Sequence, residues 1–150
     1  MLDGGDISGI PEPHDCVIEG IRQEGEFLII EFEDDISYHE SIEVIHPEAQ
    51  TLTLRFHLEG EELEGVFHYR RSKLLGDGYM RIKEFEGLQK LIQRCGIHAT
   101  YLCHYVAFHQ VIVELDADDS TLLMINADSV EFEWTLKDPS ETEDETKPVP

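Results

Sequence analysis

The sequence predicts a mainly β protein made of antiparallel hairpins, sandwich-like or barrel-like, with one amphipathic helix near residues 84–95. Three observations carry this prediction. A sixteen-residue pattern occurs twice in the first half, several later segments alternate apolar and polar residues, and a single stretch has helical periodicity. An α+β fold, with the helix packed on one face of the sheet, is the alternative.

The repeated pattern occupies residues 17–32 and 41–56, 24 positions apart and without a gap. Six positions are identical in the two copies: Ile18/Ile42, Glu19/Glu43, Ile21/Ile45, Glu24/Glu48, Leu28/Leu52 and Phe32/Phe56. Each copy has a short apolar segment, a polar turn and a second alternating segment, which is typical of a β-hairpin. We therefore expect strands at about 15–23 and 26–33, and again at about 41–46 and 50–59.

The second strand of the second copy alternates without exception. Its apolar residues are predicted to face the core: Leu52, Leu54, Phe56 and Leu58. A further strand is expected at about 63–71. Residues 72–80 contain Gly76-Asp77-Gly78 and are predicted to form a loop.

The helix is predicted from apolar residues at helical spacing between residues 84 and 95. These residues are Phe85, Leu88, Leu91, Ile92 and Cys95. Gly96 follows at a position that suits a C-terminal cap, and Lys90 and Arg94 lie where the helix dipole favours cations.

Strands return after the helix, at about 99–107, 109–115, 121–126 and 129–137. The first of these is apolar on both faces, so we expect it in the middle of a sheet, with His104 as a hydrogen-bonded core residue. The chain is then a single β-rich domain over residues 14–137. Residues 1–13 are expected to be flexible, and residues 138–150 to be a disordered acidic tail.

Charge limits the classes of partner. The 150 residues include 33 acidic and 11 basic side chains, a net charge of −22. Such a surface repels nucleic acid and anionic lipid and favours a basic protein, although acidity can also serve solubility alone. No stretch approaches the ~20 apolar residues of a membrane span, and the N-terminus lacks the features of a signal peptide. Three cysteines without close pairing favour a reduced, cytoplasmic protein.

Basic residues are concentrated between positions 70 and 94. This segment carries seven cationic and three acidic side chains, a net charge of +4, and the rest of the chain carries −26. Arg70, Arg71, Arg81 and Lys83 are therefore candidate ligands for a small molecule or an anion in a cup of the sheet. Pairing of the same side chains with the protein's own carboxylates is the competing interpretation.

Catalytic and metal-binding motifs are weak. The eight histidines include no pair at metal-binding helical spacing and there is no C-x-x-C, so no metal or cofactor is assigned. His57 and His68 are expected on adjacent strands, where they would face one another. His14-Asp15-Cys16 has the residue types of an activated thiol, but Cys16 suits a small apolar contact better. No catalytic residue is assigned, and a hydrolase using histidine and acidic residues stays a third alternative.

The stretch His14-Asp15-Cys16-Val17-Ile18, followed by an alternating strand, resembles the opening of small uncharacterised bacterial proteins that begin with H-D-[CS]-x-[IV] and a hairpin. The resemblance covers about twenty residues and implies a cytoplasmic bacterial domain of unknown function. Some acidic proteins of this size resemble immunity proteins, which neutralise basic toxin nucleases. The first functional hypothesis is thus a non-enzymatic binding domain whose acidic surface engages a basic protein.

Overall fold

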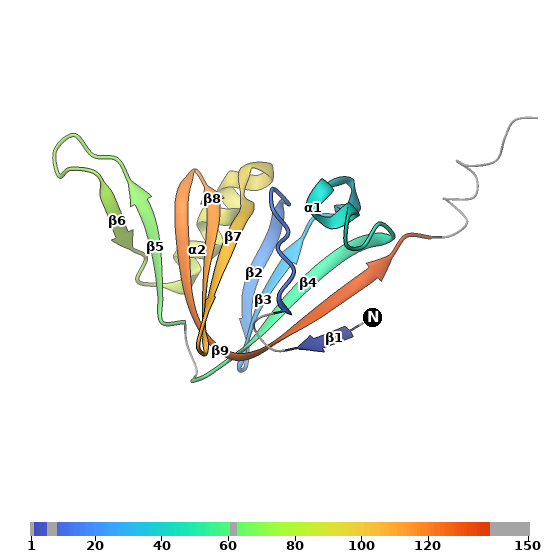
Figure 1. Ribbon diagram of the computed structural model, residues 1–150. Helices are drawn as coiled ribbons and strands as arrows, with labels where there is room; N and C mark the ends of the chain where they lie inside the picture. Colours follow the sequence, from blue (N-terminus) through green and yellow to red (C-terminus); the bar gives the residue numbers. More distant parts are fainter. Residues whose placement is uncertain (1, 6–8, 61–62, 139–150) are drawn as a thin grey trace, which may run out of the picture.

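The described residues include nine strands, which form a single antiparallel sheet that curls into a half-barrel (Figure 1). The computed structural model describes residues 2–5, 9–60 and 63–138. The strands are β1 Leu2–Gly5, β2 Ile18–Glu24, β3 Phe27–Phe32, β4 Ala49–Leu58, β5 Gly65–Arg70, β6 Gly78–Arg81, β7 Thr100–Ala107, β8 Gln110–Ala117 and β9 Asp119–Leu136. The helices are α1 Glu40–Glu43, α2 Phe85–Cys95 and the short 3-10 turns η2 Ile36–Tyr38 and η3 Gly96–His98.

The long strand β9 organises the sheet. Its second half pairs with β4 on one side and with β1 on the other, and its first half pairs with β5 and with β8. The backbone N–H groups of Glu59 and Glu64 bond to Asn126 and Met124, so β5 continues along β9 where β4 leaves it. β3 and β2 extend the sheet beyond β4, β6 extends it beyond β5, and β7 extends it beyond β8.

Backbone hydrogen bonds join two margins of this sheet, β2 and β7. Ile18 N–H donates to the carbonyl of Ala99 at 2.8 Å, and Tyr101 N–H donates to the carbonyl of Cys16 at 3.0 Å. An isolated bridge pairs Val17 with Thr100 between them. The start of β2 therefore meets the start of β7, which curls the sheet around its apolar side.

A β-bulge in β9 keeps both of its halves facing the core. Leu58 lies opposite Ala127 but His57 lies opposite Ser129, so β9 has one extra residue at this point. Before the bulge the buried side chains have odd numbers, and after it they have even numbers. They are Thr121, Leu123, Ile125 and Ala127, followed by Val130 and Trp134. One inserted residue reverses which alternate side chains point inward.

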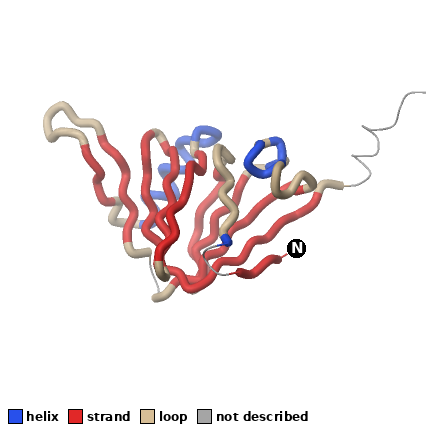
Figure 2. The backbone as a smooth tube through the Cα atoms, viewed as in Figure 1, coloured by secondary structure: helices blue, strands red, loops and turns tan. Residues whose placement is uncertain are grey.

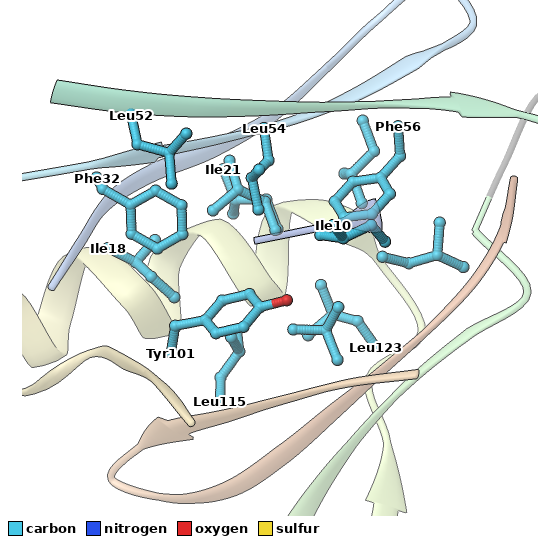
Figure 3. Close-up of a cluster of buried hydrophobic side chains, with 14 of the residues drawn as sticks. Ile10, Ile18, Ile21, Phe32, Leu52, Leu54, Phe56, Tyr101, Leu115 and Leu123 are labelled. Carbon is cyan, nitrogen blue, oxygen red and sulfur yellow. The ribbon is translucent and has the colours of Figure 1, made fainter. Parts of the chain in front are cut away.

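The core lies on the concave side of the sheet. Figure 3 shows Leu52, Leu54 and Phe56 pointing from β4 towards Tyr101 and Leu115 on the opposite wall. The predicted inward set of β4 is thereby confirmed, since all of its members are buried. Burial of so many large apolar side chains provides the main driving force for folding.

The amphipathic helix is also confirmed, as α2. Leu88 and Ile92 are buried against the core, and Leu91 is buried as well. The side-chain amide of Gln89 donates to the carbonyl of Ile21 in β2 at 3.0 Å. Gly96 ends the helix with a φ of 56°, a conformation that favours glycine.

The strand predicted at 41–46 is wrong, because this segment forms α1 and a turn. Both edges of β4 are already used, one by β3 and the other by β9. A hairpin between 41–46 and β4 would need one of these two occupied edges. The apolar residues at the repeat positions instead serve a helical turn, in which Ile42 is buried and Ile45 is exposed.

Four further expectations are corrected. Residues 2–5, expected to be flexible, form β1, because the free edge of β9 offers backbone partners to any sequence. Part of the loop predicted at 72–80 is β6, paired with β5. The strands predicted at 121–126 and 129–137 are one bulged strand.

The strand β7 lies at a margin of the sheet rather than in its middle, so Tyr105 and Val106 are exposed. Residues 139–150 of the predicted tail lie outside the described residues.

Candidate binding surfaces

Two surfaces of opposite charge lie at opposite ends of the view in Figure 1. The first is the acidic patch, residues 33–48, which includes η2 and α1 and connects β3 to β4. The second is the basic arm, residues 65–83, which is the β5–β6 hairpin with its turn and the two residues that follow. In Figure 2 the turn of the arm is the tan loop at the far left. Each surface combines charge with exposed apolar side chains.

The acidic patch contains six carboxylates and no lysine or arginine. Five of the six are exposed: Asp34, Asp35, Glu40, Glu43 and Glu48. Lys137, at the end of β9, approaches Asp35 at 3.5 Å and offsets one of these charges. The local charge is thus strongly negative even for this chain.

Three large apolar side chains are exposed among these carboxylates. Tyr38 is 72% exposed, Val44 73% and Ile45 56%. Single exposed apolar residues are ordinary on protein surfaces, but three within eight residues of sequence make a local concentration. Such a surface suits a partner that brings both cationic and apolar groups.

Contacts with the core hold the acidic patch in place. Ile36 and Ile42 are fully buried and fix η2 and α1 on the sheet. The carboxylate of Glu33 accepts a hydrogen bond from the backbone N–H of Val17 and lies 3.3 Å from Nε2 of His39. The hydroxyl of Ser41 donates to the carbonyl of His14 at 3.0 Å. The exposed residues are therefore presented on an anchored segment.

A shallow pocket of about 380 Å³ opens at the edge of the acidic patch. Its lining residues are His14, Asp15, His39, Glu40, Ser41 and Val44. Carboxylate and hydroxyl oxygens are hydrogen-bond acceptors, and the side chain of Val44 gives an apolar wall. The pocket therefore has the chemistry to receive the head of a lysine or arginine.

The neighbouring Cys16 is not an activated thiol. It is fully buried, and burial, together with the nearby carboxylates of Glu33 and Asp15, raises its pKa to about 12. A neutral thiol is a poor nucleophile. His14 bonds through Nδ1 to the carbonyl of Leu102 at 2.5 Å, so its ring serves the backbone of β7.

The structure does not bring the four predicted anion ligands together. Arg81 and Lys83 lie at the base of the basic arm, where they line a cavity of about 410 Å³ with Glu84 and Phe85. Arg70 and Arg71 lie at the far end of β5. Arg81 donates to the carbonyl of Glu64 at 3.2 Å, and Arg71 pairs with Asp119 at 3.3 Å although its side chain is 77% exposed.

The tip of the basic arm is apolar as well as basic. In the turn, Leu74 is 91% exposed and Leu75 is 75% exposed. On the adjoining strand β6, Tyr79 and Met80 are each about half exposed. Sequence reasoning missed these residues, as it missed the exposed residues of the acidic patch. The available signal was two adjacent leucines in a segment that glycine and aspartate mark as a turn.

The histidines are distributed over separate contacts. His57 bonds to Glu26 and Asp128, and His68 bonds to the hydroxyl of Thr121, so the two do not face one another. His104 is hydrogen-bonded as predicted, with Nδ1 2.7 Å from the hydroxyl of Tyr101, but it is half-buried at the margin of the sheet rather than in the core. Among the described residues, no group of three or more histidine, cysteine or acidic side chains has an arrangement that could hold a metal ion.

No helix in the described part of the chain has the length and apolar character needed to cross a membrane. Comparison with models of protein families, with curated proteins and with solved structures found no match to this chain.

Proposed function

We propose that this protein is a non-enzymatic binding domain whose acidic patch receives a basic surface of another protein. The observation that supports this proposal is the combination of five exposed carboxylates with three exposed apolar side chains on one segment anchored to the core. This role would resemble that of immunity proteins, which neutralise basic toxin nucleases.

The two kinds of side chain have different roles in such a contact. The exposed carboxylates attract a cationic partner over a distance and speed its approach. Tyr38, Val44 and Ile45 provide apolar area that leaves water when the partner docks, which slows dissociation. The affinity for the partner should therefore fall as the salt concentration rises. The part of the affinity that depends on the apolar residues should persist at high salt.

Affinity capture with matched variants tests this proposal. The immobilised protein is compared with Glu40→Lys/Glu43→Lys in the acidic patch and with Glu84→Lys/Glu86→Lys at the start of α2, which makes the same change in net charge elsewhere. We expect the patch variant alone to lose a basic protein that the wild type retains. Equal loss with both variants, or affinity for the captured protein that is unchanged between low and high salt, would contradict the proposal.

The cavity between Arg81 and Lys83 favours a second candidate function, the binding of a small anion. The carboxylate of Glu84 lines the same cavity and disfavours the binding of an anion there. Titration calorimetry with inorganic phosphate checks this candidate. Binding that Arg81→Gln abolishes would support it, and the absence of measurable heat would remove it.

A further inference from the structure

We infer that the basic arm of one molecule docks on the acidic patch of a second copy, so that the chain associates head to tail. This inference rests on the proposed function, since it uses the acidic patch as a binding surface and names its partner. It goes further because it assigns a role to the arm, which the first proposal leaves unused.

Charge complementarity is the first argument. The basic arm carries five cationic side chains and one carboxylate, a net charge of +4 in a chain of −22. The acidic patch carries six carboxylates and no lysine or arginine. Arg70, Arg71 and Lys73 are all exposed at the far end of the arm. Within the described residues only Arg71 of these three forms an ion pair, and it does so at the surface.

The apolar side chains also match. Leu74 and Leu75 extend from the tip of the arm, and Tyr38, Val44 and Ile45 are exposed on the acidic patch. Both surfaces therefore combine exposed apolar side chains with exposed charges, and the charges of the two surfaces have opposite signs. Specific interfaces use both kinds of contact, with an apolar core and a polar rim.

The arrangement of the two surfaces makes the contact intermolecular. The basic arm projects at one end of the molecule and the acidic patch lies at the other, as Figure 1 shows. The arm cannot reach the acidic patch of its own chain, so each contact joins two different surfaces on two molecules. Such a heterologous contact forms a ring if the rotation between successive molecules closes. Otherwise it leaves one arm and one patch free at the ends, which allows growth beyond a dimer.

The charge of the remaining chain disfavours other partners for the arm. A nucleic acid or an anionic lipid surface would attract the arm but would repel the rest of the chain. A second copy is repelled in the same general way, but its acidic patch offers apolar contacts in addition to charge. Because the Debye length is about 8 Å at physiological ionic strength, salt screens the general repulsion more than the pairs in contact.

Sedimentation velocity over a wide range of protein concentration tests the inference with a charge-swapped pair of variants. The arm variant is Arg70→Glu/Arg71→Glu and the patch variant is Glu40→Lys/Glu43→Lys. All four residues are exposed, so both variants should fold as the wild type does. We expect the wild type to associate, each variant alone to need about tenfold higher concentration or more, and an equimolar mixture of the two to associate again.

Further controls separate this inference from the proposed function. Leu74→Ser/Leu75→Ser should weaken association. Glu19→Lys/Glu24→Lys, at exposed positions of β2 outside both surfaces, should leave it unchanged. A wild type that stays monomeric, or a mixture that does not associate, would overturn the inference. If the acidic patch still selected a basic protein in the capture experiment, the proposed function would stand alone. Arm-dependent sedimentation of a monomeric wild type with phosphatidylserine vesicles would assign the arm to lipid instead.

Discussion

Nδ1 of His57 lies 2.7 Å from the carboxylate of Asp128, and this contact joins β4 to the bulge of β9. The bulge lies where β9 exchanges β8 and β5 for β1 and β4 as its partners. It also reverses which alternate residues of β9 face the core. A strand of 18 residues can therefore contribute to both walls of the half-barrel without exposing its apolar side.

Deletion of Asp128 tests the role of the bulge. Without the extra residue, the register that buries Leu123 and Ile125 turns Val130 and Trp134 to the solvent. We expect the deletion variant to be unfolded, as measured by circular dichroism and by the fluorescence of Trp134. Asp128→Ala keeps the residue count and should give the spectra of the wild type. A folded deletion variant with Trp134 buried would show that the bulge does not set the register.

A second prediction concerns the pH dependence of stability. Hydrogen bonds to Glu26 and then to Asp128 raise the pKa of His57 above its ordinary value of 6.5. The native state therefore binds this proton more tightly than the unfolded state does. The resulting stabilisation is complete below pH 6.5 and is lost as the pH rises through the native pKa. Urea unfolding at a series of pH values should show this loss in the wild type and not in His57→Gln.

The control for this prediction removes the hydrogen bond to Glu26, which makes the larger contribution to the raised pKa of His57. Glu26→Gln leaves the ring of His57 in place but replaces its first partner by a neutral amide. An NMR titration of this variant should give a pKa of His57 closer to 6.5 than that of the wild type. If wild type and His57→Gln lost stability equally over this pH range, the two carboxylates would not be bonded to His57 in solution.

The sequence predicted local structure well where burial on one face decides it. Alternation identified the inward residues of β4, and helical spacing identified α2, because each pattern fits a single period. The repeated hairpin misled for 41–46. Ile42 and Ile45 are three residues apart, a spacing that serves a helical turn as well as an irregular strand. Only the strand order shows that β4 has no edge available.

The candidate site depended on long-range geometry, which the sequence does not contain. Arg70 and Arg81 lie on paired strands, but the position of the turn between them places one at the far end of the arm and the other at its base. The exposure of Leu74 and Val44 could not be predicted either, because it depends on which side chains the rest of the folded chain covers. The charge imbalance was visible from the start, and the fold showed where the charges lie.

A third prediction tests the core between β3 and β4. Leu28 and Phe56 lie directly opposite one another, and both are fully buried. Leu28→Ala should lower the free energy of unfolding by about 2–5 kcal/mol and Phe56→Ala by about 3–5 kcal/mol, as measured by urea denaturation. Thr53→Ala, on the outer face of β4, should cost less than ~1 kcal/mol. A loss of less than ~1 kcal/mol for either core residue would contradict the assignment of Leu28 and Phe56 to the inner face of the sheet.

The last prediction concerns Cys16. Its pKa of about 12, against an ordinary 9.0, leaves about a thousandfold less thiolate at pH 8 than an exposed cysteine has. In a variant with Cys95→Ser and Cys103→Ser, reaction of the remaining thiol with a disulfide reagent should be at least about a hundredfold slower in the native protein than in urea. Replacement of His14 by alanine should not slow it further, because the His14 ring bonds to Leu102. Rapid labelling of the native protein that depended on His14 would instead support a cysteine nucleophile at this position.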